Sequence, residues 1–87
     1  MDDELVILKA LADETRLKIV KFLLKGEKCV CEIFPLVGRT QSTTSIQLDY
    51  LKRSGVLDSR REGKRVYYFI KDERVNKTFR ALGYKSN

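Results

Sequence analysis

Apolar residues recur with a helical period through the first third of the chain. Leucines spaced three apart predict a first helix over residues 3–12. Asp13 can cap a second helix, because its carboxylate accepts from the free N–H groups of a first turn, and Gly26 can end it. The apolar residues of this second helix are Leu17, Ile19, Val20, Leu23 and Leu24. Two helices that bury their apolar sides are therefore expected before the first cysteine.

The middle of the chain predicts a short helix and then a longer one. Cys29 and Val30 are expected to be briefly extended. The short helix that follows ends at Gly38 and carries Ile33, Leu36 and Val37. Pro35 lies late in this helix and removes one of its backbone hydrogen bonds. The longer helix is expected over about residues 41–54, with an inner face of Thr44, Leu48 and Leu51.

The period then changes to the alternation of a β-hairpin. The segments VLDSRR and KRVYYFI alternate, and Glu62–Gly63 provides a tight turn between them. The expected inner face is Val66, Tyr68 and Ile70, with Tyr67 and Phe69 on the other face. A last helix is expected over about residues 72–84, with an apolar stripe of Val75, Phe79 and Leu82.

A helix–turn–helix followed by a hairpin is the plan of a winged helix. The predicted fold class is therefore mainly α with a small β-hairpin, and residues 1–87 form a single winged helix–turn–helix domain. A chain of this length buries roughly 60–65% of its unfolded surface, so its core is thin and often needs help from a partner chain.

The start of the longer helix is unusual in its side chains. Five of the six residues from Thr40 to Ser45 carry a hydroxyl, and no charge occurs between Arg39 and Asp49. Such residues lower helix propensity. The plain explanation is an exposed helix start, but a cap needs one hydroxyl rather than five.

Base reading is the alternative explanation for this helix start. In a helix–turn–helix, the N-terminal residues of the second helix contact base edges in the major groove. Serine and threonine bond several bases, glutamine can bond adenine through two bonds, and isoleucine can touch a thymine methyl. The expected base-reading residues are Gln41, Ser42, Thr43, Ser45, Ile46 and Gln47. Asp49 would be repelled by phosphates unless Lys52 or Arg53 neutralises it.

Positive charge is concentrated in the same half of the chain. Residues 1–37 hold six Lys and Arg against seven Asp and Glu, and residues 38–87 hold twelve against five, so the net charges are −1 and +7. Such an asymmetry indicates a polyanionic partner, with nucleic acid first and a membrane surface second, and double-stranded DNA is the partner expected. The expected backbone and wing contacts are Arg39, Arg60, Arg61, Lys64 and Arg65. The plain alternative is that the charges around the hairpin turn are only solvated and contact no partner.

Several classes of function are disfavoured by what the sequence lacks. No segment is long and apolar enough to span a membrane, and the acidic start is wrong for a signal peptide, so a cytoplasmic location without a membrane partner is expected. The chain contains no histidine, which removes the usual acid–base catalyst at neutral pH. A small thiol enzyme is therefore disfavoured, and no enzyme activity and no required cofactor are expected.

A resemblance to a known family runs through four segments, LKALADETRLKIVKFL, KCVCEI, TQSTTSIQLDYLKRSGVL and SRREGKRVYYFI. Through these segments the sequence resembles the ArsR/SmtB family of winged-helix repressors. It implies a homodimer, built through the first and last helices, that binds a palindromic operator and represses transcription. Members usually carry histidine where this chain has Gln47. A winged-helix module that binds proteins and never touches DNA remains the alternative from another class.

The resemblance also extends to Cys29 and Cys31. CVC matches the block that binds metal ions in the arsenic-, antimony- and cadmium-responsive members, which implies release from the operator by arsenite, antimonite or cadmium. A trigonal site for soft ions needs three thiolates. Here Phe34 occupies the family's third nearby cysteine position. Three interpretations stay open: an ion site completed from elsewhere, a disulfide that acts as a redox switch, or small apolar side chains that only pack. If the two cysteines only pack, the protein would be a repressor that responds to no effector through them.

Overall fold

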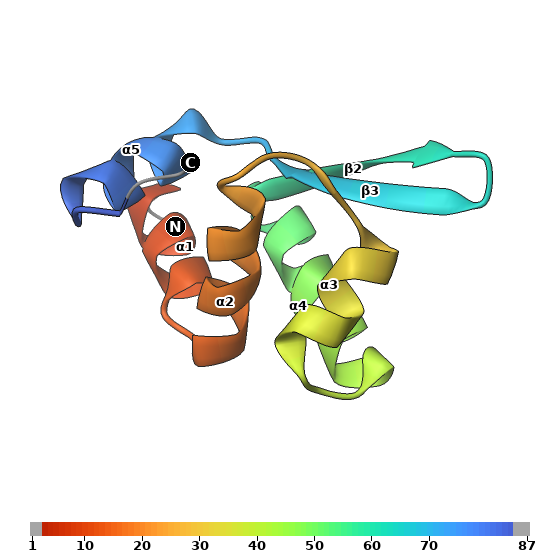
Figure 1. Cartoon of the computed structure of the whole chain (residues 1–87). Helices are drawn as coiled ribbons and strands as arrows, with labels where there is room; N and C mark the ends of the chain where they lie inside the picture. Colours follow the sequence, from red (N-terminus) through yellow and green to blue (C-terminus); the bar gives the residue numbers. More distant parts are fainter. Residues whose placement is uncertain (1–2, 85–87) are drawn as a thin grey trace.

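The computed structural model describes residues 3–84 and confirms the winged-helix plan (Figure 1). Its five helices and three short strands follow in the order α1 (Asp3–Leu11), α2 (Glu14–Leu23), β1 (Lys28–Cys29), α3 (Val30–Val37), α4 (Gln41–Arg53), β2 (Leu57–Glu62), β3 (Arg65–Ile70) and α5 (Glu73–Ala81). Figure 1 shows β2 and β3 extending to one side of the helices as a wing. No helix in residues 3–84 is long and apolar enough to cross a membrane.

The helix ends follow the capping residues in the sequence. The Asp13 carboxylate accepts from the backbone N–H of Arg16 at 3.0 Å, which caps α2 as expected. Gly38 ends α3 with a φ of 72°, a left-handed conformation that L side chains rarely adopt. The tight change of direction at Gly38 brings the start of α4 into place three residues later.

The sheet contains one strand more than the predicted hairpin. β3 lies between β2 and β1, in the order β1-β3-β2, and both pairs are antiparallel. Lys28 is opposite Tyr68, and Cys29 is opposite Tyr67. The prediction that Val30 is extended was wrong, because Val30 begins α3. The base of the wing is therefore hydrogen-bonded to the segment that carries the first cysteine.

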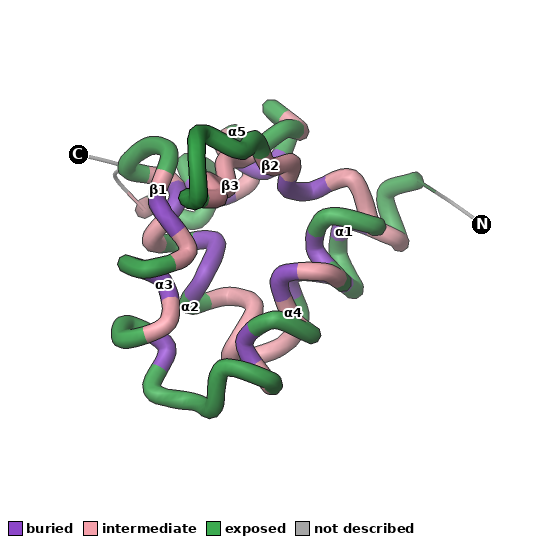
Figure 2. The backbone as a smooth tube through the Cα atoms, turned by 90° about the vertical axis from the view of Figure 1, so that its right-hand side faces the viewer, coloured by how far each residue is buried: buried purple, intermediate pink, exposed green. Residues whose placement is uncertain are grey.

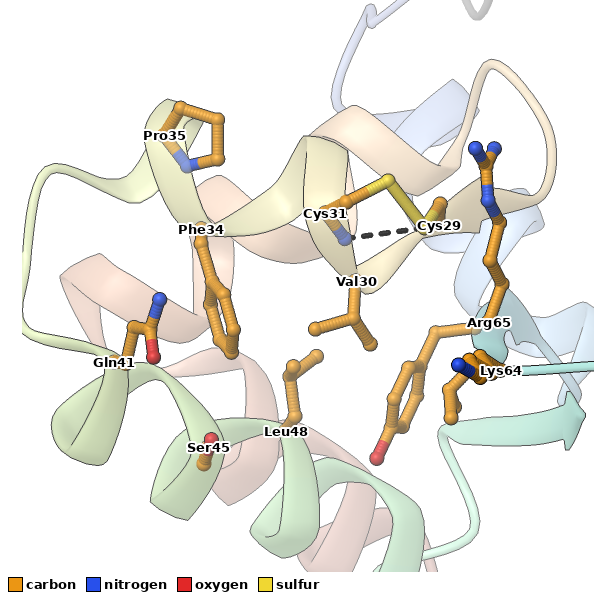
Figure 3. Close-up of a pocket in the computed structure, with 12 residues that line it drawn as sticks. Cys29, Val30, Cys31, Phe34, Pro35, Gln41, Ser45, Leu48, Lys64 and Arg65 are labelled. Atoms are coloured by element: carbon orange, nitrogen blue, oxygen red, sulfur yellow. Dashed lines mark hydrogen bonds between the residues drawn. A yellow bond between two sulfur atoms is a disulfide. The ribbon is translucent and has the colours of Figure 1, made fainter.

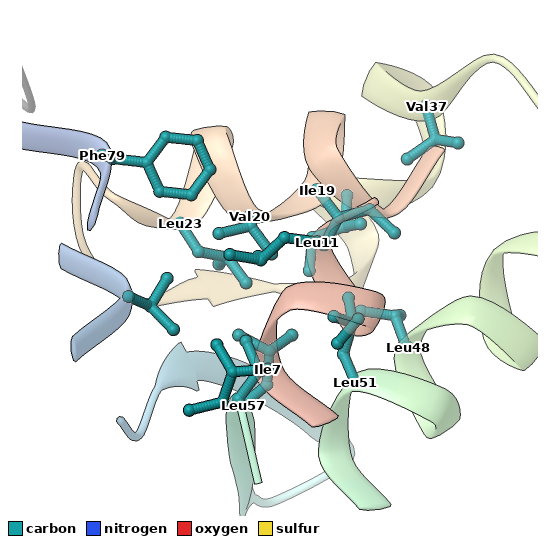
Figure 4. Packing of buried hydrophobic residues seen from close by; sticks show 14 residues of the cluster. Ile7, Leu11, Ile19, Val20, Leu23, Val37, Leu48, Leu51, Leu57 and Phe79 are labelled. Carbon is teal, nitrogen blue, oxygen red and sulfur yellow. The ribbon is translucent and has the colours of Figure 1, made fainter. Parts of the chain in front are cut away.

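The core lies between the helices and the base of the sheet (Figures 2 and 4). Ile19 and Val20 of α2 and Leu51 of α4 are fully buried there. Figure 4 shows Leu48 and Leu51 of α4 pointing toward the apolar side chains of α1 and α2. Burial of these apolar side chains stabilises the fold and fixes the rotation of α4 about its own axis.

Some apolar residues expected to pack lie at the surface instead. Leu82 follows the end of α5 and is 75% exposed, so it does not extend the buried stripe of Val75 and Phe79. Leu36 at the end of α3 is also exposed. On α1, Leu5 and Leu8 are exposed while Ile7 is buried. The first helix and the C-terminal end of the described chain thus present apolar surface that no other part of residues 3–84 covers.

Candidate nucleic-acid interface

The packing of α4 decides which of its side chains are available. Thr44, Leu48 and Leu51 are buried, as the sequence predicted. The residues on the opposite side, at the N-terminal end, are consequently turned outward. The exposed ones are Gln41, Ser42, Ser45 and Ile46, and Thr43 and Gln47 are half-buried. Ile46 is 65% exposed, although it is an aliphatic residue in the middle of a helix.

Three of the five hydroxyls at this helix start are used within the protein. Thr40 is the N-cap and accepts from the backbone N–H of Thr43 at 3.1 Å. Its hydroxyl also donates to the hydroxyl of Thr43 at 3.0 Å. The buried Thr44 hydroxyl donates to the carbonyl oxygen of Thr40 at 3.0 Å. Capping thus explains part of the hydroxyl run, and Ser42 and Ser45 remain as exposed hydroxyls without a role in the cap.

Gln47 is held by a residue that the sequence did not single out. Arg16 of α2 donates from Nη1 to the side-chain oxygen of Gln47 at 2.9 Å. The same guanidinium donates to the carbonyl oxygens of Ala10 and Lys9 at the end of α1. It also lies 4.0 Å from the ring centroid of Tyr50, one turn further along α4. Arg16 therefore joins three helices at the flank of the predicted base-reading residues.

The acidic residue on the outer face of α4 is neutralised locally. Arg53 donates to the carboxylate of Asp49 one turn away, so Arg53 is the residue that provides the expected neutralisation. Lys52 donates instead to the hydroxyl of Ser59 on β2 at 2.9 Å. The repulsion that Asp49 would exert on a phosphate is reduced by this pair.

The register of the wing separates its arginines onto two faces. Arg60 is opposite Tyr67 and Arg61 is opposite Val66. Because side chains alternate along a strand, Arg61 shares a face with Val66 and Arg60 lies on the other face. Val66 lines a cleft against α4, so the face of Arg61 is the one directed toward the helix–turn–helix. Within residues 3–84, Arg39, Arg61, Lys64 and Arg65 form no ion pair.

Arg60 is instead engaged by two carboxylates. Its guanidinium contacts Glu27 at 2.6 and 2.7 Å and Glu62 at 2.8 Å, and it lies 4.7 Å from the ring centroid of Tyr67. The hydrogen bonds from Arg60 lower the pKa of Glu27, and those to Glu27 and Glu62 raise the pKa of Arg60. The sequence predicts a phosphate contact at Arg60; in the structure its guanidinium is paired with Glu27 and Glu62, and the phosphate contact stays a prediction.

A cleft of about 660 Å³ separates α3, the first half of α4 and β3 (Figure 3). Figure 3 shows Val30 and Phe34 pointing from α3 toward α4. Gln41 and Ser45 line the cleft from α4, and Lys64 lines it from the tip of the wing. Tyr68 also lines the cleft; burial raises the pKa of its hydroxyl, and the Asp49 carboxylate raises this pKa further. The cleft thus connects the predicted base-reading and wing residues.

The two cysteines lie at the edge of the same cleft. Their sulfurs are joined as a disulfide, with the Cα atoms 5.1 Å apart. Cys29 is buried and caps α3: its sulfur accepts from the N–H of Cys31, and its own N–H donates to Glu32 at 2.9 Å. Residues 3–84 contain no group of three His, Cys, Asp or Glu side chains that could hold a metal ion. One chain thus supplies two of the three thiolates that a trigonal site requires.

The chain is similar in sequence to known bacterial regulatory proteins. A family model described as "Bacterial regulatory protein, arsR family" matches residues 13–59. The cadmium resistance transcriptional regulatory protein CadC of Listeria innocua is 48% identical over 68 residues, which cover 77% of this chain and 57% of that protein. The chain therefore spans a little over half the length of this curated relative.

Solved structures give the same similarity in fold. HlyU from Vibrio cholerae has a TM-score of 0.87 and 34% identity, over 92% of this chain and 87% of that one. A domain of Mb0332 from Mycobacterium bovis, described as a homodimeric winged helix-turn-helix DNA-binding domain, has a TM-score of 0.84 and 38% identity. That match covers 94% of this chain and 76% of the Mycobacterium domain.

Proposed function

This chain belongs to the arsR family of bacterial regulatory proteins, and from that premise we propose that it is a cytoplasmic, homodimeric repressor that binds operator DNA. The observation that carries the proposal is the outward-facing N-terminal end of α4. Its exposed side chains are short and uncharged or apolar, which suits close approach to base edges in the major groove. Within residues 3–84, these exposed side chains belong neither to the buried core nor to the cap of α4.

The wing supplies the electrostatic part of binding. Arg61, Lys64 and Arg65 lie at the tip of the hairpin and have no carboxylate partner within residues 3–84. Cations at this place reach phosphates that flank the groove occupied by α4. Arg39, just before α4, has the same freedom and adds a contact at the helix start. Arg60 contributes to the fold of the wing rather than to phosphate binding.

Dimerisation accounts for the apolar surface on the first helix and beyond the last. Leu5 and Leu8 of α1 and Leu82 after α5 are exposed. A second copy that covers these residues would remove apolar surface from water and place two α4 helices on one operator. The homodimeric state of the similar Mycobacterium domain supports this arrangement.

The thiols of Cys29 and Cys31 provide the input for release from DNA. Cys29 pairs with β3 of the wing and caps α3 of the helix–turn–helix, so a change at its sulfur affects both DNA-contacting parts. In the reduced state, the two cysteines offer sulfur ligands of the kind that soft ions such as arsenite, antimonite and cadmium prefer. Because one chain supplies two thiols, a third ligand comes from solvent, a small thiol or another subunit. Oxidation to the disulfide is the competing input, and it needs no ion.

The experiment that tests DNA binding is a selection followed by a titration. The protein selects duplexes from a random pool, and binding of labelled selected and unselected duplexes is measured at several salt concentrations. The proposal expects a palindromic selected sequence that binds at least about a thousandfold more tightly than unselected DNA, and binding that weakens as salt rises. A winged-helix module that binds only proteins would select nothing and show no salt-dependent binding to duplex DNA.

A further inference from the structure

We infer that Arg16 fixes the side-chain amide of Gln47 in one orientation, so that Gln47 presents its NH2 group to DNA and reads a hydrogen-bond acceptor on the base edge. This inference rests on the proposed function and assigns one part of its sequence specificity. It gives Arg16, a residue of α2 outside the recognition helix, the role of a positioning residue.

Arg16 is held in place independently of Gln47. Its Nε donates to the carbonyl oxygen of Ala10 at 2.8 Å, and its Nη2 donates to that of Lys9 at 3.1 Å. Its guanidinium also stacks at 4.0 Å over the ring centroid of Tyr50. These contacts fix the plane of the guanidinium, and the remaining Nη1 is aimed at Gln47.

The chemistry of the two groups then determines the orientation of the amide. An arginine side chain only donates hydrogen bonds, whereas a glutamine amide both donates and accepts. The group 2.9 Å from Nη1 must therefore be the oxygen of Gln47. A flip of the amide would place two donors against each other. The NH2 group of Gln47 is consequently the end that remains available for DNA.

A fixed amide reads fewer bases than a free one. Guanine, adenine and thymine each present an acceptor in the major groove, whereas cytosine presents only an amino donor. Gln47 is thus expected to reject cytosine at the position it contacts. The two-bond pairing with adenine predicted for a free glutamine belongs instead to Gln41, which is exposed and has no side-chain hydrogen bond within residues 3–84.

The two glutamines of α4 therefore form a natural pair of test and control. Gln47→Glu keeps an acceptor for Arg16 but removes the NH2 donor. We expect this variant to change base preference at one position of each half-site, away from guanine and thymine and toward the amino-bearing cytosine and adenine, by roughly tenfold. Gln41→Glu should change a different position and leave the Gln47 position as in the wild type.

Arg16→Met tests the positioning role itself. Once freed from Arg16, Gln47 can flip its amide and accept from a base, so discrimination against cytosine at that position should fall by roughly tenfold. In the Gln47→Ala background, Arg16→Met should change no base preference at all. If the single variant instead lowers affinity equally for every sequence, Arg16 is a purely structural residue and the inference is wrong.

The measurement is the relative affinity of each variant for all four base pairs at every position of the selected duplex. If the wild type selects no DNA, the proposed function fails. If it selects DNA but Gln47→Glu leaves all preferences unchanged, only this inference fails. Gln47→Glu retains its partner in Arg16, so it decides the matter even if Arg16→Met does not fold.

Discussion

Arg60 and Glu27 form a two-bond ion pair, at 2.6 and 2.7 Å, that joins strand β2 of the wing to the loop before β1. The next residue, Arg61, lies on the opposite face of the strand and has no carboxylate partner within residues 3–84. Two adjacent arginines of one strand thus have different tasks. The first holds the wing to the body of the protein, and the second is free to meet DNA.

The salt dependence of DNA binding should separate these two arginines. Arg61→Ala should weaken binding to selected and unselected duplexes alike, and the slope of log K against log salt should become shallower by about 0.9 for each phosphate contact removed. Arg60→Ala should leave the slope unchanged, because its charge is already balanced. Equal slopes for Arg61→Ala and the wild type would remove Arg61 from the interface.

The exposed and buried apolar residues of α4 should respond differently to truncation. Leu51 is fully buried, so Leu51→Ala should lower the free energy of unfolding by about 2–5 kcal/mol. Ile46 is 65% exposed, so Ile46→Ala should change stability by less than about 0.5 kcal/mol but weaken binding to the selected duplex. Urea unfolding and DNA titration of both variants check this. A large loss of stability in Ile46→Ala would mean that Ile46 packs within the protein.

The pair between Glu27 and Arg60 predicts a pH dependence of stability. Hydrogen bonds from Arg60 lower the pKa of Glu27 below its usual 4.5, so the pair stabilises the folded state above that pH. The contribution is lost as pH falls through the lowered pKa of the folded state. Urea unfolding at pH 6 should show Glu27→Gln to be slightly less stable than the wild type, since the pair is solvent-exposed. The two proteins should become equal toward pH 3, and a difference that grows on acidification would contradict the assignment.

The thiol input predicts a response that depends on both cysteines. Arsenite, antimonite or cadmium added to reduced protein, or a mild oxidant, should lower affinity for the selected duplex. Cys29→Ser combined with Cys31→Ser should abolish the response, and dithiothreitol should reverse that of the oxidant alone. DNA titration in each condition distinguishes ion from oxidant. If the double variant responds as the wild type does, the thiols only pack or cap the helix.

The sequence predicts the helices and their inner faces because these depend on local periodicity. The spacing of Thr44, Leu48 and Leu51 predicts the inner face of α4, and all three residues are buried. The strand β1 could not be predicted as part of the sheet, since two residues are too few to show alternation. Only its pairing with β3 stabilises it as a strand.

The contacts that refine the candidate site are long-range and left no pattern in the sequence. Arg16 meets Gln47 across 31 residues, and Arg60 meets Glu27 across 33. The sequence contains eighteen Lys and Arg residues. Exposed charged residues show no periodicity, so their spacing does not indicate which residue each of them contacts. Only the packing of α1, α2 and α4 brings Arg16 to the flank of the recognition helix.

The most direct measurement is the change in backbone amide NMR signals when labelled protein binds its selected duplex. If the start of α4 enters the major groove and the tip of the wing meets the backbone, the largest changes should fall on residues 40–47 and 61–65. The outer face of α2, at Lys18 and Lys21, should change little. Large changes on α2 together with unchanged signals over residues 40–47 would contradict the account.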